Sequence, residues 1–155
     1  MFKHIMVALD GSTYSQGTLP TAIELAKKFG SDIFVLHVSE HDRGRAAVYS
    51  LESPAQATRL VADAVEKAND AGVKAAGDVR NAPAQHTART IVEMAAAKGI
   101  DLIVMGSRGL SDVQGLFLGS VTHKVIQTAG LPVLVARGAV MGTAAERSPE
   151  KAAIV

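Results

Sequence analysis

Residues 101–125 read DLIVMGSRGLSDVQGLFLGSVTHKV, and this stretch carries the strongest indication of the fold. It opens with a short, nearly continuous apolar run, DLIVM, which is typical of a strand buried on both faces of a parallel sheet. A glycine-containing loop with Gly106 and Gly109 follows, and Gly119 and Ser120 then open a helical segment. A strand, a loop and a helix in this order predict an α/β protein whose functional loop follows the carboxyl end of a strand.

Four further segments have strand character, at residues 4–9 (HIMVAL), 32–38 (DIFVLHV), 132–136 (PVLVA) and, more weakly, 73–79 (VKAAGDV). Segments of helical character separate them, at residues 13–29, from 53 to a closing glycine at 72, at 83–98 and at 120–129. Strands that alternate with helices predict a parallel sheet with right-handed crossovers. The expected fold is therefore a Rossmann-like, three-layer α/β sandwich around a five-stranded parallel sheet.

Single residues predict where several of these elements begin and end. Pro20 predicts that the first helix is kinked or starts late, because proline is excluded from helix interiors. Ser53 followed by Pro54 is a typical helix start. Gly130 is expected to cap the last helix. Residues 41–52 show no clear period and are expected to form a mobile loop.

The composition limits the kind of protein this is. The length of 155 residues suits one domain, expected over residues 1–138, with a flexible tail at 139–155. Sixteen basic and fifteen acidic residues give a net charge of +1, which is no electrostatic footprint for nucleic acid or a membrane surface. Without cysteine there is no disulfide or thiolate site, and no stretch approaches the roughly 20 apolar residues of a membrane span. A cytoplasmic protein with an aliphatic core is expected.

The polar residues that follow the predicted strands indicate where a ligand would bind. Asp10 follows the first strand, and Gly106 and Gly109 follow the strand at 101–105. Glycines let backbone N–H groups approach a phosphate, and the helix that opens at Gly119 adds unpaired N–H groups with partial positive charge. A flexible loop whose glycines serve only turns and a cap is the alternative, and the residues alone leave both open.

The spacing of these residues resembles a known family. Gly106 and Gly109, then nine residues, then Gly119 and Ser120 resemble the ATP-binding signature of the universal stress proteins. The segments IMVALDGS, FVLHV, DLIVMGSRG and LPVLVAR extend the resemblance over almost the whole chain. It implies an adenine nucleotide alpha hydrolase-like fold and a nucleotide-dependent regulator of a stress response rather than an enzyme. Slow ATP hydrolysis or self-phosphorylation at a serine is the alternative, for which the sequence offers no recognisable catalytic base.

The resemblance also assigns roles by position. The residues it implies around the nucleotide are Ala8 and Leu9 lining adenine, Asp10 on the ribose, Val38 reading adenine through its backbone, Gly106, Arg108 and Gly109 at ribose and phosphates, and Gly119, Ser120 and Val121 at the phosphates. The ligand would be ATP, with ADP and AMP as alternatives, and magnesium or manganese would bridge the phosphates. A homodimer through residues 132–136 and a regulatory protein partner of unknown identity complete the expectation.

Competing interpretations remain at this point. The motif HxxEH, with His37, Glu40 and His41, matches a zinc-protease pattern, but that chemistry needs a helix and these residues complete a predicted strand. Asp10 has a second interpretation as the cap of the first helix. A rival function is a nucleotide-independent dimeric scaffold or chaperone-like module. A metabolic enzyme acting on an AMP-containing substrate is a third.

Overall fold

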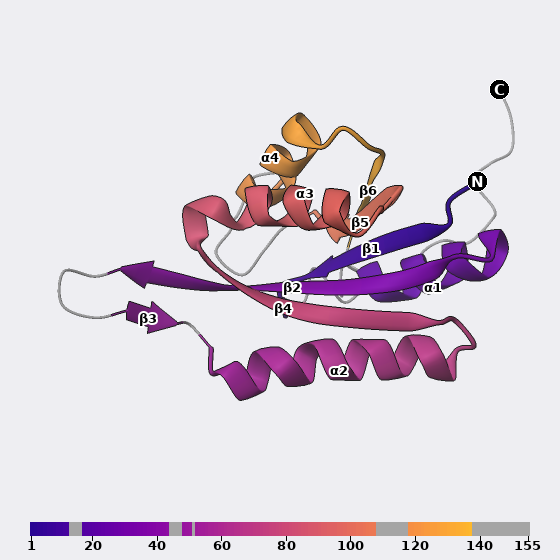
Figure 1. Cartoon of the computed structure of the whole chain (residues 1–155), viewed down its shortest axis with the longest axis horizontal. Coiled ribbons are helices and arrows are strands. Elements are labelled where there is room, and N and C mark those ends of the chain that lie inside the picture. Colours follow the sequence, from indigo (N-terminus) through magenta and orange to yellow (C-terminus); the bar gives the residue numbers. More distant parts are fainter. Residues whose placement is uncertain (13–16, 44–47, 51, 108–117, 138–155) are drawn as a thin grey trace, which may run out of the picture.

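The computed structural model describes residues 1–12, 17–43, 48–50, 52–107 and 118–137, with the backbone alone at 42–43 and 48–50. Its layers are a sheet with helices on both faces (Figure 1). Helices α1 (Thr18–Phe29) and α2 (Pro54–Asp70) pack against one face. Helices α3 (Thr87–Ala97) and α4 (Ser120–Thr128) pack against the other. Among the described helices, none is both long and apolar enough to cross a bilayer.

The five predicted parallel strands are confirmed. They are β1 (His4–Leu9), β2 (Asp32–Arg43), β4 (Ala75–Pro83), β5 (Leu102–Gly106) and β6 (Val133–Ala136). Their order across the sheet is β4-β2-β1-β5-β6, and every pairing among them is parallel. The strand order reverses on either side of β1, which is where α/β sheets bind ligands at their carboxyl edge.

A sixth strand corrects the prediction of a loop at residues 41–52. Strand β2 continues to Arg43, and β3 (Val48–Ser50) pairs with its end in antiparallel register. Residues 44–47 and 51 lie outside the described part of the chain. The end of β2 is polar and β3 is only three residues long, so hydrophobic periodicity gives no strand signal although the backbone can still pair.

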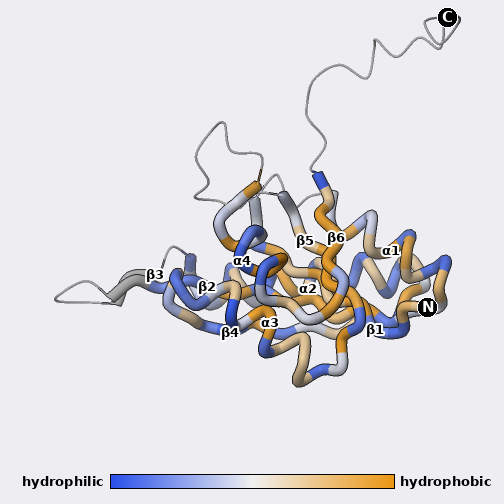
Figure 2. Tube along the Cα trace, turned by 90° about the horizontal axis from the view of Figure 1, so that it is seen from above, coloured by the Kyte–Doolittle hydropathy of each residue, from blue (hydrophilic) through white to orange (hydrophobic). Residues whose placement is uncertain are grey.

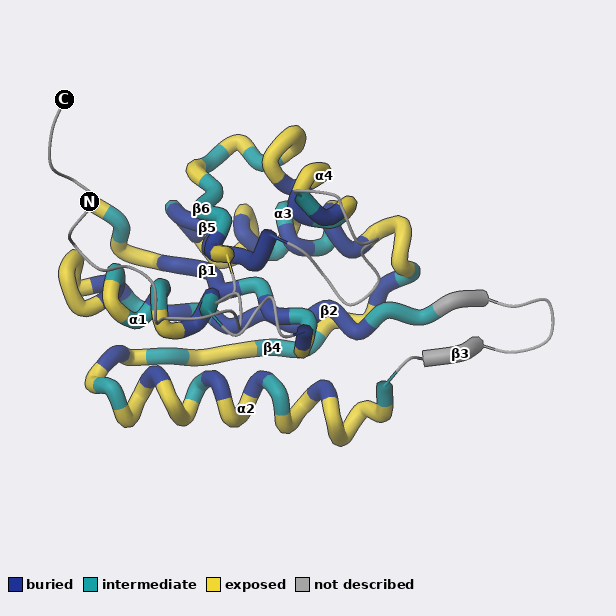
Figure 3. Tube along the Cα trace, turned by 180° about the vertical axis from the view of Figure 1, so that it is seen from behind, coloured by how far each residue is buried: buried dark blue, intermediate teal, exposed yellow. Residues whose placement is uncertain are grey.

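The core is aliphatic and divided by the sheet. Alternate residues of β1 point to opposite faces, so Ile5 and Val7 pack with α1 and α2, while Met6 packs with α3 and α4. Figure 2 shows the strands as the apolar centre of the molecule, and Figure 3 shows buried residues recurring along the sheet-facing side of α2. Val35 and Val104, on the neighbouring strands, are completely buried.

The helix starts follow the predicted capping chemistry. Helix α1 begins late, at Thr18, which leaves Pro20 in the first turn where no intrahelical N–H bond is required. Helix α2 begins after the cap residue Ser53, with Pro54 at its first position, as predicted. Ser53 Oγ accepts a hydrogen bond from the Gln56 N–H (3.2 Å), and Gln56 Oε1 accepts one from the Ser53 N–H (2.8 Å). This reciprocal pair is a capping box.

Two predicted boundaries are wrong. Pro83 does not open a helix but is the last residue of β4, after which a short 3-10 turn, Ala84–His86, leads into α3. Gly130 does not cap α4, because the chain already leaves the helix at Ala129, whose φ of −71° and ψ of 126° are extended. The polar edge strand and the extended exit both lack a strong local sequence signal.

Helix α2 lies unusually close to β4 at one glycine. A Cβ atom added to Gly77 would lie 2.5 Å from Val61 Cγ1 and 2.9 Å from the carbonyl oxygen of Val35. Both neighbours are constrained, since one belongs to a β-branched side chain and the other to the backbone. Gly77 is therefore required by space between helix and sheet.

Candidate functional site

The predicted ligand residues converge on one edge of the sheet. Strands β1, β2 and β5 are adjacent and parallel, so their carboxyl ends lie together. That edge holds the predicted residues of the described chain, namely Ala8, Leu9, Asp10, Val38 and Gly106 at strand ends, and Gly119, Ser120 and Val121 at the start of α4. Arg108 and Gly109 lie outside the described residues.

Strand β2 extends beyond β1 at this edge. The last β1–β2 pair is Leu9 with His37, whereas β2 runs on to Arg43. The Asp32 N–H donates to the Lys3 carbonyl (2.9 Å) on the β1 side, and backbone groups alternate along a strand. By this alternation the backbone groups of Val38 also face the β1 side, with the Val38 carbonyl directed past the end of β1. A ligand bound beyond the end of β1 would contact the backbone of Val38, as the predicted role of Val38 requires.

Asp10 closes the turn that leaves β1. Its Oδ1 accepts a hydrogen bond from the Ser12 N–H (2.9 Å), and Gly11 between them has a φ of 78°, in the left-handed region that favours glycine. The interpretation of Asp10 as a helix cap is wrong, because α1 starts at Thr18 after Gly17 and has no side-chain cap. Asp10 is instead a half-buried carboxylate at the ligand edge of the sheet.

The start of α4 is tied directly to the end of β5. The Gly119 N–H donates to the Ser107 carbonyl (2.6 Å), and the buried Thr122 hydroxyl donates to the Gly106 carbonyl (2.8 Å). No side chain caps this helix, and its first turn contains no acidic residue. The φ of −70° and ψ of 159° at Gly119 are open to any residue, so backbone conformation does not explain the glycine. An uncapped start without a side chain suits the close approach of an anion.

A buried histidine joins β1 to the segment before α2. His37 is 2% exposed; its Nδ1 lies 2.7 Å from the Leu9 carbonyl oxygen, and its Nε2 contacts Glu52 Oε1. His37 lies opposite Leu9 in the last β1–β2 pair, at the edge of the sheet that holds the predicted ligand residues. Glu52 was missed, because it is distant in sequence and falls in the segment predicted as a loop.

The zinc-protease pattern is not realised. Its residues lie on a strand, so Glu40 and His37 point to opposite faces. Glu40 Oε1 accepts a hydrogen bond from the Thr87 hydroxyl (2.7 Å) at the start of α3, away from both histidines of the motif. Within the described ranges, no three or more histidine or carboxylate residues cluster as metal ligands.

A cavity of 460 Å³ opens at the same edge on the side of α2. Ser39 and His41 of β2, Asn81 of β4 and Pro54 of α2 belong to its lining, which includes none of the predicted nucleotide residues. The adjoining helix start offers little to an anion, since its donors are used by the capping box or missing at Pro54.

Comparisons with known proteins place these features in context. The model of the universal stress protein family matches residues 1–137. The universal stress protein YxiE of Bacillus subtilis is 35% identical over 156 residues, which cover 88% of this chain and 100% of that protein. A solved structure of the Archaeoglobus fulgidus universal stress protein, in complex with dAMP, has a TM-score of 0.67 at 24% identity and covers 87% of this chain and 98% of that one. Another, a universal stress protein in complex with cAMP, has a TM-score of 0.65 at 19% identity, covering 88% and 98%.

Proposed function

The chain belongs to the universal stress protein family, and we propose that it binds ATP as a nucleotide-dependent regulator of a stress response. The observation that carries the proposal is the uncapped start of α4, tied to the end of β5 at the strand edge that also holds Asp10 and Val38. A phosphate needs backbone donors and positive potential, and a helix start of this kind supplies both.

Each part of the nucleotide has a counterpart at this edge. The Val38 carbonyl, directed past the end of β1, would accept from the adenine amino group, with Ala8 and Leu9 lining the base. Asp10 would accept from the ribose hydroxyls through the oxygen that does not close its turn. The phosphates would lie at Gly119, Ser120 and Val121. Gly106 is adjacent, and Arg108 and Gly109 keep their predicted roles at the ribose and phosphates. A magnesium or manganese ion would bridge the phosphates.

The named ligands of relatives support an adenine nucleotide. One neighbouring structure is a complex with dAMP and another a complex with cAMP, which share the adenine base and one phosphate with ATP. ATP, ADP and AMP would use the same base and ribose contacts here and differ in how many phosphates reach the helix start. Mass spectrometry of the nucleotide released from purified, denatured protein identifies the one that is carried.

A regulatory role fits the site better than catalysis. The described part of the edge presents Asp10 and the buried His37, and His37 is engaged on both ring nitrogens. General-base catalysis requires a group within reach of the attacking proton, and neither side chain is placed for that role at the helix start. We infer that binding, rather than turnover, is the output.

Gly119→Val tests the phosphate site. A valine side chain would stand where phosphate approaches the helix start, so ATP affinity should fall by roughly tenfold or more while the fold is kept. Isothermal titration calorimetry measures the affinity and circular dichroism the fold. Gly130→Val is the matched control, because a Cβ at Gly130 meets nothing within 4 Å. Equal affinity in Gly119→Val and wild type would remove the proposed site.

A homodimer through β6 is the second part of the proposal. Strand β6 is the edge of the sheet, and Val133, Leu134 and Val135 on it are only half-buried. An apolar edge strand favours pairing with a second copy about a two-fold axis. Light scattering should report a dimer, and the double variant Val133→Lys, Val135→Lys should shift it toward monomer. A dimer that forms while ATP binds nowhere would favour the rival role as a scaffold.

A further inference from the structure

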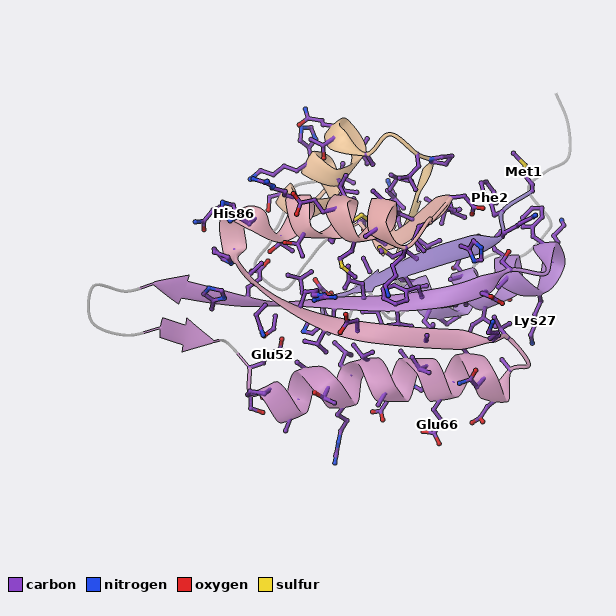
Figure 4. The ribbon with its side chains drawn as sticks, viewed as in Figure 1. Met1, Phe2, Lys27, Glu52, Glu66 and His86 are labelled. Atoms are coloured by element: carbon purple, nitrogen blue, oxygen red, sulfur yellow. The ribbon has the colours of Figure 1, made fainter. Side chains whose placement is uncertain are left out.

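The buried histidine on β2 opposite the end of β1 lies between two hydrogen-bond acceptors. His37 Nδ1 is 2.7 Å from the Leu9 carbonyl oxygen, and Nε2 contacts the carboxyl group of Glu52. Leu9 is the last residue of β1, and Glu52 directly precedes Ser53, the cap of α2. Figure 4 shows Glu52 at the junction of β3 and α2. The side chain therefore joins the proposed nucleotide edge to the segment that enters α2.

The hydrogens of this arrangement follow from its partners. A carbonyl oxygen only accepts, so Nδ1 must carry a hydrogen. Nε2 then either carries a second hydrogen and donates to a Glu52 carboxylate, or accepts from a protonated Glu52. The two descriptions contain the same number of protons and the same net charge of zero for the pair. In either case the pair holds one proton more than a neutral imidazole and an ionised carboxylate would hold together.

Loss of that proton would break the contact. The Nε2 lone pair would then face a carboxylate oxygen, which is repulsive in a site where His37 is 2% exposed. The pair would also change from neutral to a net charge of −1. The contact between His37 and the partly exposed Glu52 would then be lost.

We propose that His37 and Glu52 share a buried proton that positions the end of β1, so that nucleotide affinity decreases as pH rises. His37 is a positioning residue, because it acts through the Leu9 carbonyl on the turn that presents Asp10. Two effects have the same sign: loss of the proton loosens the turn that carries Asp10, and it leaves a negative charge near a polyanionic ligand. The effect on affinity rests on the proposed function; the shared proton does not.

Few other side chains near His37 could produce the same decrease in nucleotide affinity with rising pH. The other charged or titratable side chains that the structure describes on β1, β2, β4 and the first turns of α2 around His37 are Asp10, Glu40, His41, Asp78, Arg80, Arg59 and Asp63. Glu40 bonds Thr87 on the opposite face, and Asp78 pairs with Arg80 (2.8 Å). His41 is a second imidazole on the same face of β2 as His37, so it requires a control variant.

Nuclear magnetic resonance of the imidazole nitrogens tests the proton without nucleotide. When pH is raised from about 5 to about 8, loss of the shared proton should leave His37 with a hydrogen on Nδ1 alone. At the acidic end, either both ring nitrogens carry hydrogen, or a carbon signal of Glu52 reports a protonated carboxyl. A single ring hydrogen on Nε2, or an ionised Glu52 beside a neutral ring throughout, would overturn the proposal.

Two substitutions of Glu52 test the coupling to the nucleotide. The amide of Glu52→Gln can donate to a neutral Nε2 or accept from a protonated one, so it keeps the contact at every pH. Glu52→Ala loses the contact at every pH. ATP itself gains and loses a proton in this range, and Glu52→Gln serves as the control for that effect. Relative to this control, wild-type ATP affinity should decrease by roughly 3- to 10-fold as pH rises across the range. Glu52→Ala should bind weakly throughout, and His41→Gln should follow wild type.

The outcomes separate the two proposals. A decrease in ATP affinity that is as large in Glu52→Gln as in wild type would overturn the positioning role of His37, and so would a difference between the two that disappears in His41→Gln. Failure of ATP to bind at any pH would overturn the proposed function and the effect on affinity with it, while the resonance titration would still decide whether the proton is shared.

Discussion

The two helix starts at the carboxyl edge of the sheet have opposite chemistry. At α2, Ser53 and Gln56 bond each other's backbone N–H groups, and Pro54 has no N–H to offer. At α4, Gly119 has no side chain, and the first turn holds no acidic residue. A helix whose own side chains cap its start has little left for a ligand, whereas a start whose cap residue has no side chain leaves room for an anion. The comparison shows that a helix start suits an anion when it has neither a capping side chain nor an acidic residue in its first turn.

Their attachment to the sheet differs as well. Helix α2 packs along β4, with Val61 and Val65 against the space above Gly77. Helix α4 is held at its start by the Gly119 N–H and the Thr122 hydroxyl, each bonded to a carbonyl at the end of β5. One helix contributes mainly to the core, while the other is fixed where a ligand would sit.

Gly119→Asp gives the start of α4 a capping side chain and should have the largest effect on ATP affinity. The backbone at Gly119 is extended, as a capping residue requires, so the carboxylate should take the N–H groups that phosphate would use. ATP affinity should fall by about 100-fold, equivalent to about 2.7 kcal/mol, while the helix becomes more stable. Calorimetry and thermal unfolding measure the two effects. Gly119→Asn, which caps without charge, should lose less affinity; unchanged binding in both variants would contradict the comparison.

Gly77→Ala tests how closely α2 is docked. The added methyl group would meet Val61 and the Val35 carbonyl, so we expect a loss of about 1–3 kcal/mol in the free energy of unfolding. Urea unfolding gives this value, and ATP affinity should not change. Gly130→Ala, whose methyl group meets nothing within 4 Å, should stay within about 0.5 kcal/mol of wild type. Equal stability of the two variants would show that helix and strand separate easily.

Ser53→Ala opens the start of α2 and should have the smallest effect. Loss of the side-chain acceptor for the Gln56 N–H should reduce the free energy of unfolding by about 1 kcal/mol. ATP affinity should be unchanged, because this helix start is not the proposed phosphate site. Ser53→Thr, which keeps the hydroxyl, should restore most of the stability. If Ser53→Ala altered ATP binding as strongly as Gly119→Asp, the two starts would not be functionally distinct.

Local signals predicted much of the fold. The predicted strand at residues 4–9 coincides with β1 at both ends, because after the exposed His4 the buried positions of this strand are all apolar. Ser53 and Pro54 marked the start of α2, since capping uses neighbouring residues. The end of β2, the strand β3 and the end of β4 were missed. They are polar or very short segments whose strand conformation comes from backbone pairing rather than from side-chain periodicity.

The candidate site shows the same division. Ala8, Leu9, Asp10, Val38 and the residues at the start of α4 lie at one edge because each follows or precedes an element that the sequence reveals. Their roles toward a nucleotide stay predictions. The contact of His37 with Glu52 was not predictable, because it crosses a segment without periodic signal and depends on where β3 returns the chain.

The unequal lengths of β1 and β2 have a consequence for specificity. Beyond Leu9, β2 no longer has a β1 residue beside it, so the register that joins the two strands stops at His37. A flat heterocycle with a hydrogen-bond donor on its edge would bond to the backbone of β2 there, as a residue of a longer β1 would. Recognition of this kind uses main-chain atoms that every residue carries. Substitutions at Val38 could therefore alter how tightly the ring packs without changing which ring is chosen.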